Sequence, residues 1–311
     1  MLDSLSVVIP VYNGAATVPP LIDRLRAVVQ NAASKYEIIL VNDGSRDSSW
    51  ATIESLARRY PEIVGIDLMR NYGQHNALLC GIRRTRFDVI VTLDDDLQQP
   101  PEEIPRLLEK LAEGFDVVYG TPEQEQHGLW RNFGSRMTKA ALGTATSAAV
   151  APMVSAFRAF RASVKPAFSD YRSPLLSIDV LLTWATTSFA SVVVRREPRR
   201  SGTSNYRIRS LVRHAMNMMT GYSLLPLQLA TMIGFVFTLF GVLVLAFVLG
   251  RYLIAGTSVA GFPFLASIIA IFSGAQLFAL GIIGEYLGRM HLRTMERPAY
   301  IVRTAIPPGQ A

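Results

Sequence analysis

Three consecutive carboxylates, Asp94, Asp95 and Asp96, with Gln98 two positions later, are the residues best suited to chemistry in this sequence. In an extended backbone alternate residues share a side, so Asp94, Asp96 and Gln98 point one way and Asp95 the other. Oxygen donors that converge in this way suit Mg²⁺ or Mn²⁺, hard cations that bridge to phosphates. The alternative is a solvated acidic loop beside the dipole of the next helix. Because adjacent carboxylates repel one another, the pattern favours a bound cation.

Two further polar clusters contain groups that could bind a ligand: Tyr12-Asn13-Gly14, and the segment VNDGSRDSS at residues 41–49. Asp-Gly-Ser is first of all a turn sequence, and the polar residues after it can cap the following helix. Asp43 can instead accept hydrogen bonds from a base or a ribose, provided that it lies near the acidic cluster. Its role therefore depends on the elements that place it.

Short β-rich runs alternate with amphipathic helical stretches over the first 120 residues or so. Strands are predicted at residues 6–9, 37–41, 63–67, 88–93 and 115–119, and helices at 18–30, 47–59, 74–84 and 101–113. This alternation predicts an α/β fold with a mostly parallel, Rossmann-like sheet and helices on both faces. Such sheets bind ligands at the carboxyl ends of their strands, and one crevice there could contain all three polar clusters. Further on, a helical region ends near residue 150, a helix is predicted at 178–186 and a strand at 191–195.

Two long stretches near the C-terminus, residues 215–250 and 252–284, contain no Asp, Glu, Lys, Arg or His. Each exceeds the ~20 apolar residues needed to cross a bilayer. The alternative is a pair of core helices in a soluble protein, but such helices ordinarily carry a polar stripe, and residues 233–249 have none. We therefore predict two transmembrane helices, at about 226–250 and 262–287.

Basic residues flank both predicted spans, and they are Arg207, Arg209 and Arg213 before the hairpin and Arg289, Arg293 and Arg297 after it. By the positive-inside rule the hairpin belongs to a cell membrane with the soluble domain and both termini cytoplasmic. The net charge of +7 collects beside the spans, so anionic lipid is a simpler partner than nucleic acid, and no nucleic-acid partner is expected. The single cysteine, Cys80, suits a reducing compartment.

The predicted organisation has four parts. Residues 1–194 form the α/β domain, 195–223 a basic interfacial connector, 224–288 the two spans, and 289–311 a cytoplasmic tail.

Four motifs, in order, resemble the GT-A glycosyltransferases of family 2, in the polyprenyl-phosphate branch related to dolichol-phosphate mannose synthase, which includes the bacterial undecaprenyl-phosphate enzymes. They are SVVIPVYNG at 6–14, VNDGSRD at 41–47, RNYGQHNALLCGI at 70–82 and LDDDLQQPP at 93–101. The resemblance implies that Pro10, Tyr12 and Asp43 line a nucleotide pocket. It also implies that Asp94, Asp96 and Gln98 hold Mg²⁺ or Mn²⁺ on the donor diphosphate, with Asp95 and Asp96 among the catalytic residues.

Two further segments, SAFRAFR at 155–161 and RREPRRSGTSNY at 195–206, resemble the acceptor side of that family. Guanidinium groups bind phosphate through paired donors, so Arg158, Arg200 and Arg207 are candidates to hold a lipid phosphate, and Arg158 is also a candidate catalytic residue. Attraction to lipid headgroups is the alternative for these arginines. The chain departs from the family pattern at Asn205, where many relatives have Lys, and at Gly14, where they have Glu.

No residue stands out as a catalytic base, because Ala156 occupies the position where some relatives carry an acid. A phosphate monoester is largely dianionic at neutral pH, so the acceptor needs positioning more than deprotonation. Asp95, Asp179 and His75 are weaker candidates for a base.

The resemblance implies inverting transfer of one sugar, from a nucleotide-sugar that is expected to be UDP-linked, to polyprenyl phosphate at the cytoplasmic membrane face. A processive polysaccharide synthase would need more spans and a Gln-x-x-Arg-Trp motif, which the sequence lacks. A non-catalytic, membrane-tethered nucleotide-sugar-binding protein is the alternative from another class, and the intact Asp94, Asp96 and Gln98 set disfavours it. Self-association into a homo-oligomer is compatible with the resemblance.

Overall fold

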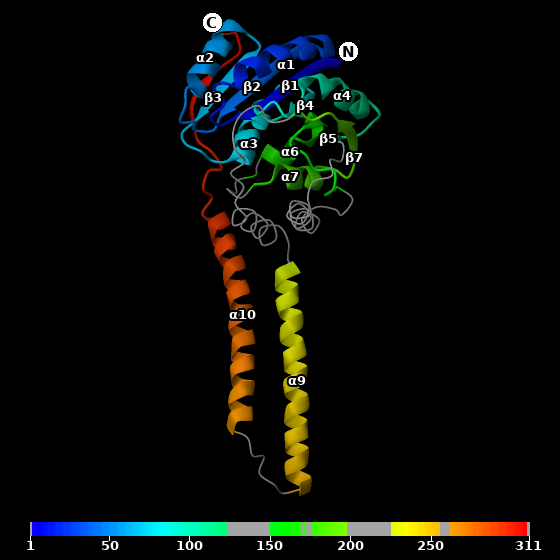
Figure 1. The fold of residues 1–311 in the computed structure, drawn as a ribbon, viewed down its shortest axis with the longest axis vertical. Coiled ribbons are helices and arrows are strands. Elements are labelled where there is room, and N and C mark those ends of the chain that lie inside the picture. The colour runs from blue at the N-terminus through cyan, green and yellow to red at the C-terminus, as the bar shows by residue number, and fades with distance from the viewer. Residues whose placement is uncertain are drawn as a thin grey trace. The chain divides into compact units, whose positions relative to one another are not determined.

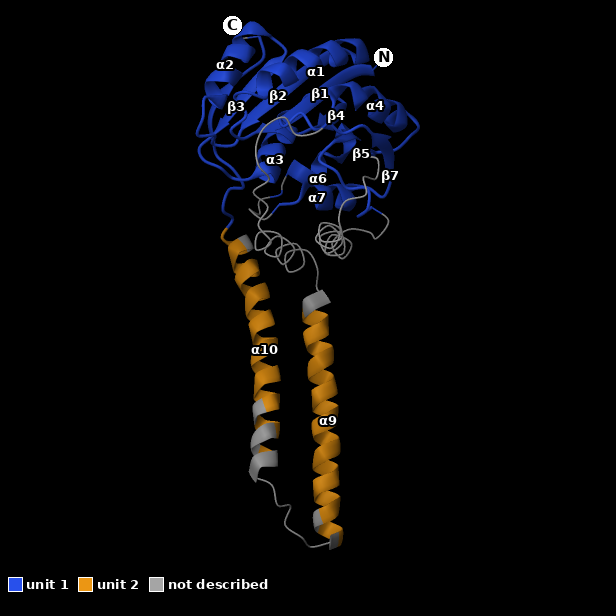
Figure 2. Cartoon of the chain, viewed as in Figure 1, with its two compact units in different colours: residues 1–208, 296–311 blue, residues 209–295 orange. Residues whose placement is uncertain are grey.

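The computed structural model describes residues 2–122, 150–169, 171, 176–197, 225–255 and 262–309. The chain divides into two compact units, one made of residues 1–208 with 296–311 and the other of residues 209–295 (Figure 2). The first unit is the α/β domain and the second is the helical hairpin.

Eight described strands form one mixed sheet in the order β7-β5-β6-β4-β1-β2-β3-β8 (Figure 1). Their bounds are β1 Leu2–Val11, β2 Ala33–Asn42, β3 Ile63–Leu68, β4 Val89–Thr92, β5 Val117–Pro122, β6 Arg158–Arg161, β7 Phe189–Val194 and β8 Val302–Ile306. Strand β1 pairs in parallel with β2 and β4, and β2 in parallel with β3. Strands β6 and β8 are antiparallel to their neighbours. The predicted mostly parallel α/β sheet is therefore confirmed.

Helices cover both faces of the sheet, as the alternating pattern predicts. They are α1 Val18–Ala32, α2 Ser49–Arg59, α3 Gln74–Arg84, α4 Ile104–Ala112, α6 Pro166–Ser169 and α7 Ile178–Ala185, with short 3₁₀ turns at Pro101–Glu103 and Ala162–Val164. Helices α1, α2 and α4 contribute to one apolar core, and α3, α6 and α7 to the other. Within β1, Val7 and Ile9 enter the first core and Val8 the second, as the two-residue period of a strand requires.

Two strands were not predicted from the sequence. Strand β6 is only four residues long, and it bridges β4 and β5 in antiparallel register. Strand β8 lies in the segment expected to be a cytoplasmic tail, where it pairs with the edge of β3. In both cases the strand depends on a neighbouring edge that local sequence does not reveal.

Two long apolar helices form the second unit, α9 Leu225–Ala255 and α10 Phe262–Thr294. Within them the segments Leu227–Arg251 and Ile271–Leu292 are long and apolar enough to cross a membrane, and none of their most apolar residues is buried. The helices meet where the rings of Phe237 and Phe272 pack edge to face, with centroids 5.8 Å apart. Large side chains such as Phe235 are exposed on these helices, which is typical of a surface that contacts lipid or another protein.

Candidate active site

The three polar clusters lie together at the carboxyl ends of neighbouring strands. Strands β4, β1 and β2 are parallel neighbours, so their carboxyl ends lie side by side. The loops that follow β1 and β2 are joined directly: the Asn13 N–H donates to Ser45 Oγ at 2.9 Å, and the Arg46 N–H donates to Asn13 Oδ1 at 2.9 Å. The Tyr12 N–H donates to Asp95 Oδ2 at 3.4 Å, which links the acidic cluster to the same loop.

The backbone of the acidic cluster turns instead of continuing as a strand. Strand β4 ends at Thr92, residues 95 and 96 lie in a turn, and Leu97 has a positive φ of 59°. The carboxylate of Asp96 stabilises this turn by accepting the Gln98 N–H at Oδ1 over 3.0 Å. The expectation of an extended backbone through this segment is therefore wrong from Asp95 onward, because local Asx-turn hydrogen bonding replaces sheet pairing.

The side chain of Asp95 is directed into the loop after β1. A Cβ atom added to Gly14 would lie only 2.4 Å from Asp95 Oδ2, so the carboxylate occupies space that only glycine leaves open. Burial, together with repulsion from Asp94, raises the pKa of Asp95 to about 7. The departure from the family pattern at Gly14 therefore has a direct structural consequence at Asp95.

The predicted cation ligands each have a hydrogen-bond partner from this chain. Asp94 Oδ1 accepts from Gln74 Nε2 at 2.5 Å, and Gln98 Oε1 accepts from Arg196 Nε at 3.0 Å. Among the described residues no three His, Cys, Asp or Glu side chains are grouped so as to hold a metal ion. The set of two carboxylates and one amide oxygen nevertheless fits Mg²⁺ or Mn²⁺, which take hard oxygen donors and leave positions for water and substrate phosphates.

Asp43, expected in the nucleotide pocket, supports the loop that begins α3. Its two carboxylate oxygens accept the Tyr72 N–H at 2.7 Å and the Gly73 N–H at 2.9 Å, and burial raises its pKa. The neighbouring Gly44 has φ 63°, and a Cβ there would lie 2.4 Å from the backbone of Arg70 and Asn71. The loops after β2 and β3 are thus packed backbone against backbone. Each oxygen of Asp43 retains capacity for a further donor.

Pro10 and Tyr12 occupy different environments in β1 and the loop after it. Pro10 is buried within the strand, where it is paired with Val41 of β2. Tyr12 is 45% exposed just after the carboxyl end of β1, and its ring presents an apolar face there.

Arg158 lies in the interior rather than at an open phosphate site. It is on β6 with 1% exposure, where its Nη1 contacts Asp179 Oδ1 and its Nε donates to Thr92 Oγ1 at 3.0 Å. Tyr119 Oη also donates to Asp179 Oδ1, at 3.0 Å. This buried network places an ion pair beside Thr92, the last residue of β4. The other two candidates for the acceptor phosphate, Arg200 and Arg207, lie outside the described residues, as does Asn205.

The candidates for a base are also held by structural contacts. Asp179 is the buried partner of Arg158 in the first turn of α7. His75 Nδ1 accepts the backbone N–H of Ile178 at 3.4 Å.

Sequence reasoning missed the contacts between the acidic segment and the residues after β7. Arg195 Nε pairs with the buried carboxylate of Glu103 at 2.9 Å, and the Glu197 N–H donates to the carbonyl of Gln98 at 2.9 Å. Arg24 of α1 pairs with both Glu197 and Glu102, each at 2.7 Å. The complementary charges of residues 102–103 and 195–196 were the available signal, but nothing in their spacing indicated that they meet.

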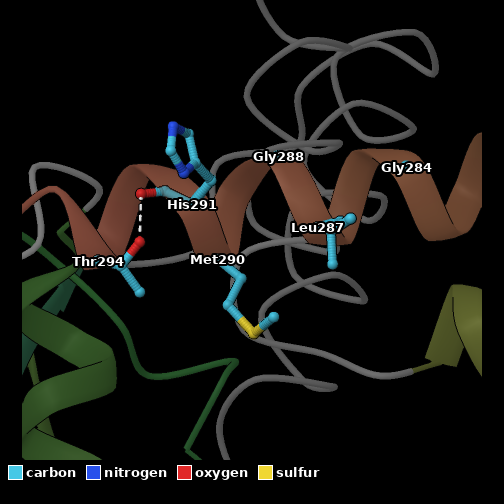
Figure 3. Close-up of a pocket in the computed structure, with 6 residues that line it drawn as sticks. All are labelled: Gly284, Leu287, Gly288, Met290, His291 and Thr294. Atoms are coloured by element: carbon cyan, nitrogen blue, oxygen red, sulfur yellow. Dashed lines mark hydrogen bonds between the residues drawn. The ribbon is translucent and has the colours of Figure 1, made fainter.

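A separate hollow lies along α10 (Figure 3). Its lining residues are Gly284, Leu287, Gly288, Met290, His291 and Thr294. The Thr294 hydroxyl there donates to the His291 carbonyl at 2.8 Å, as a turn of the same helix permits. None of the predicted site residues that the structure describes lines this hollow.

Comparison with known proteins places these observations in a family. The model of glycosyl transferase family 2 matches residues 6–164. The chain is 36% identical over 308 residues to the undecaprenyl-phosphate 4-deoxy-4-formamido-L-arabinose transferase of Pseudomonas aeruginosa PAO1, covering 98% of this chain and 91% of that one. The enzymes of the same name from Pseudomonas syringae pv. syringae and Shewanella sediminis are each 36% identical, with 97% of this chain and 92% of theirs covered.

Among solved structures, the fold is similar to that of glucosyl-3-phosphoglycerate synthase from Mycobacterium tuberculosis. Its complex with Mn²⁺, UDP and glucosyl-3-phosphoglycerate aligns with a TM-score of 0.50 and 19% identity, over 70% of this chain and 78% of that one. A complex of the same enzyme with Mn²⁺, UDP-glucose and phosphoglyceric acid gives a TM-score of 0.51 and 18% identity, with the same coverage. At these identities the similarity extends to the fold alone.

Proposed function

The chain belongs to glycosyl transferase family 2, and from this premise we propose that it transfers one sugar from a nucleotide-sugar to undecaprenyl phosphate. The product would be a polyprenyl-monophosphate sugar. The acceptor is supported by the relatives named undecaprenyl-phosphate sugar transferases, which match over nearly their whole length. The donor is proposed to be UDP-linked, in keeping with the UDP bound by the enzyme of similar fold.

The observation that carries the proposal is that one segment of the chain links the residues proposed to bind the two parts of the donor. A single loop, residues 69–74, gives two backbone N–H groups to Asp43 and the side chain of Gln74 to Asp94. Asp43, proposed to bind the nucleoside, is thereby linked to Asp94, proposed to bind the cation on the diphosphate. A site that must hold both parts of a nucleotide-sugar needs this fixed geometry.

The residues have distinct tasks in the proposed reaction. Tyr12 contacts the nucleotide, Pro10 supports the pocket from within β1, and Asp43 accepts hydrogen bonds from the base or ribose. A divalent cation held by Asp94, Asp96 and Gln98 would neutralise the charge that develops on the departing diphosphate. Arg158 is assigned a positioning task, because its charge is committed to Asp179 beneath β4.

The acceptor phosphate is largely ionised at neutral pH, so single displacement with inversion needs alignment rather than a strong base. Arg200 and Arg207 are proposed to align it. We place the reaction at the cytoplasmic face of the membrane, with the hairpin spanning the bilayer and the basic residues of 199–213 at the headgroups. The α/β domain would then reach the lipid phosphate without extracting the lipid.

A donor screen tests the proposed function. Purified full-length protein is incubated with undecaprenyl phosphate, Mn²⁺ and a panel of radiolabelled nucleotide-sugars, with EDTA in parallel. We expect labelled glycolipid from one donor of the panel, formed with Mn²⁺ and abolished by EDTA. Absence of glycolipid with every donor would contradict the proposal.

The cation set gives a second test of the same proposal. Asp96→Ala should lower turnover about a hundredfold or more, because charge on the leaving group is no longer neutralised. Asp23→Ala removes an exposed carboxylate from α1 and serves as the matched control, with turnover expected near that of the unaltered protein. Equal activities for the two variants would remove the cation from the mechanism.

A further inference from the structure

The strand that follows the membrane hairpin joins the sheet next to the proposed donor site. Strand β8 pairs antiparallel with β3, and the register is interrupted between Asp67 and Leu68. Asp67 is paired with Thr304 and Leu68 with Val302, so Arg303 is the extra residue of a β-bulge. A bulge redirects a side chain that regular pairing would point elsewhere.

The guanidinium of Arg303 makes two contacts at the carboxyl end of β3. Its Nη1 lies 3.3 Å from Asp67 Oδ2, and its Nη2 donates to the Met69 carbonyl at 2.9 Å. Asp67 is only 2% exposed, so its carboxylate needs a compensating charge. The other oxygen of Asp67 accepts from Asn42 Nδ2 at 2.7 Å, and Asn42 directly precedes Asp43.

Met69 begins the segment, residues 69–74, that forms hydrogen bonds to Asp43 and Asp94 in the proposed donor site. Its N–H donates to the carbonyl of Ile301 at 2.9 Å, so both backbone groups of Met69 are held by the C-terminal segment. The same loop ends at Gly73 and Gln74, whose bonds to Asp43 and Asp94 are described above. Arg303 is therefore connected to the site by two routes, one through Asp67 and Asn42 and the other along the loop.

We propose that Arg303 is a positioning residue for binding of the nucleoside diphosphate part of the donor. By holding Asp67 and Met69 it fixes the 69–74 loop against Asp43 and Asp94, and β8 is thereby a component of the donor site as well as an edge strand. This inference rests on the proposed function for the identity of the ligand. A purely structural strand would protect the sheet edge and affect stability without affecting donor binding.

The test is a titration of full-length protein with UDP in the presence of Mn²⁺. Arg303→Ala should weaken UDP binding about threefold to tenfold and raise the KM for the donor by a similar factor, while the KM for undecaprenyl phosphate is unchanged. Arg303→Lys keeps the charge near Asp67 but not the paired grip, and it should restore part of the affinity. Arg297→Ala, which removes an exposed positive charge from the same segment, is the matched control and should bind UDP like the unaltered protein.

Hydrogen exchange supplies a readout that does not depend on the ligand. The Tyr72 and Gly73 amides bound to Asp43 should exchange faster in Arg303→Ala than in Arg297→Ala. Unchanged exchange together with unchanged UDP affinity in Arg303→Ala would overturn the inference. Failure of the unaltered protein to bind UDP would instead contradict the UDP assignment, and the exchange comparison would then decide the inference by itself.

Discussion

Asp95 is the acidic residue that packs against Gly14, so the identity of this one neighbouring residue determines its environment. Its carboxylate fills the space that Gly14 leaves open and accepts the Tyr12 N–H. Asp94 accepts a hydrogen bond from Gln74, and Asp96 accepts one from the Gln98 backbone N–H. Burial and repulsion from Asp94 raise the pKa of Asp95 to about 7.

The raised pKa of Asp95 predicts a pH-dependent effect of Asp95→Asn on stability. The unfolded chain releases this proton near pH 4, whereas the folded protein keeps it until about pH 7, so the charged carboxylate destabilises the fold as pH rises through that window. In metal-free protein, Asp95→Asn should therefore raise the melting temperature by a few degrees at pH 8 and change it little at pH 4.5. A difference that is the same at both values of pH would contradict this account.

Gly14 provides a second test at the same place. Gly14→Ala puts a Cβ 2.4 Å from Asp95 Oδ2, and we expect destabilisation by about 1–3 kcal/mol and reduced turnover. The double variant Gly14→Ala with Asp95→Ala should recover the stability, because the clashing carboxylate is gone. Thermal unfolding of both variants measures this, and a double variant no more stable than the single one would show that the clash lies elsewhere.

At the scale of elements, a buried polar network joins four parts of the fold. Its centre is the ion pair between Arg158 of β6 and Asp179 of α7. Hydrogen bonds connect this pair to Tyr119 of β5 and Thr92 of β4. Since Thr92 is the last residue of β4, this network sets the position from which the acidic turn departs.

Removing one charge of this ion pair should lower the free energy of unfolding more than removing both. Arg158→Met leaves Asp179 buried without a counterion, and a loss of about 3–5 kcal/mol is expected. Adding Asp179→Asn removes the uncompensated charge while Asn can still accept from Tyr119, so the double variant should be clearly more stable than the single one. Thermal denaturation of the two variants decides, and equal melting temperatures would contradict the role given to the pair.

The elements also show what could be predicted from the sequence. Helices α1 to α4 and α7 and strands β1 to β5 and β7 were predicted because apolar periodicity and turn residues mark each one locally. Strands β6 and β8 were not, because they are short and are held by edges formed far away in the chain. Local motifs were likewise enough to identify Asp43 and Asp94 as candidate site residues. The contacts that Arg303 and Arg196 make with this region could not be predicted, because these residues are distant in sequence.

At the scale of the whole molecule, the hairpin is an insertion in the α/β domain. The chain leaves the first unit, forms α9 and α10 and then returns to complete the sheet with β8 (Figure 2). The α/β domain is therefore made of two stretches of sequence, and the predicted boundary at residue 289 does not separate a tail from a complete fold.

This organisation predicts that a soluble form requires the C-terminal strand. Residues 1–208 joined to 296–311 through a flexible Gly/Ser linker of roughly 15 residues should fold without detergent. Residues 1–208 alone leave the edge of β3 unpaired, and they should melt at a lower temperature and aggregate more readily. Equal melting temperatures for the two forms would show that β8 is dispensable for the fold.

The central claim is that this family 2 enzyme places a single sugar on a polyprenyl phosphate, and the mass of the lipid product tests it most directly. Full-length protein, the donor selected by the screen, Mn²⁺ and undecaprenyl phosphate are combined, and the extracted lipid is analysed by mass spectrometry. We predict one product, the lipid monophosphate enlarged by a single sugar residue, and none from Asp96→Ala. A lipid carrying a sugar diphosphate or a polymer, or no lipid product at all, would contradict the account.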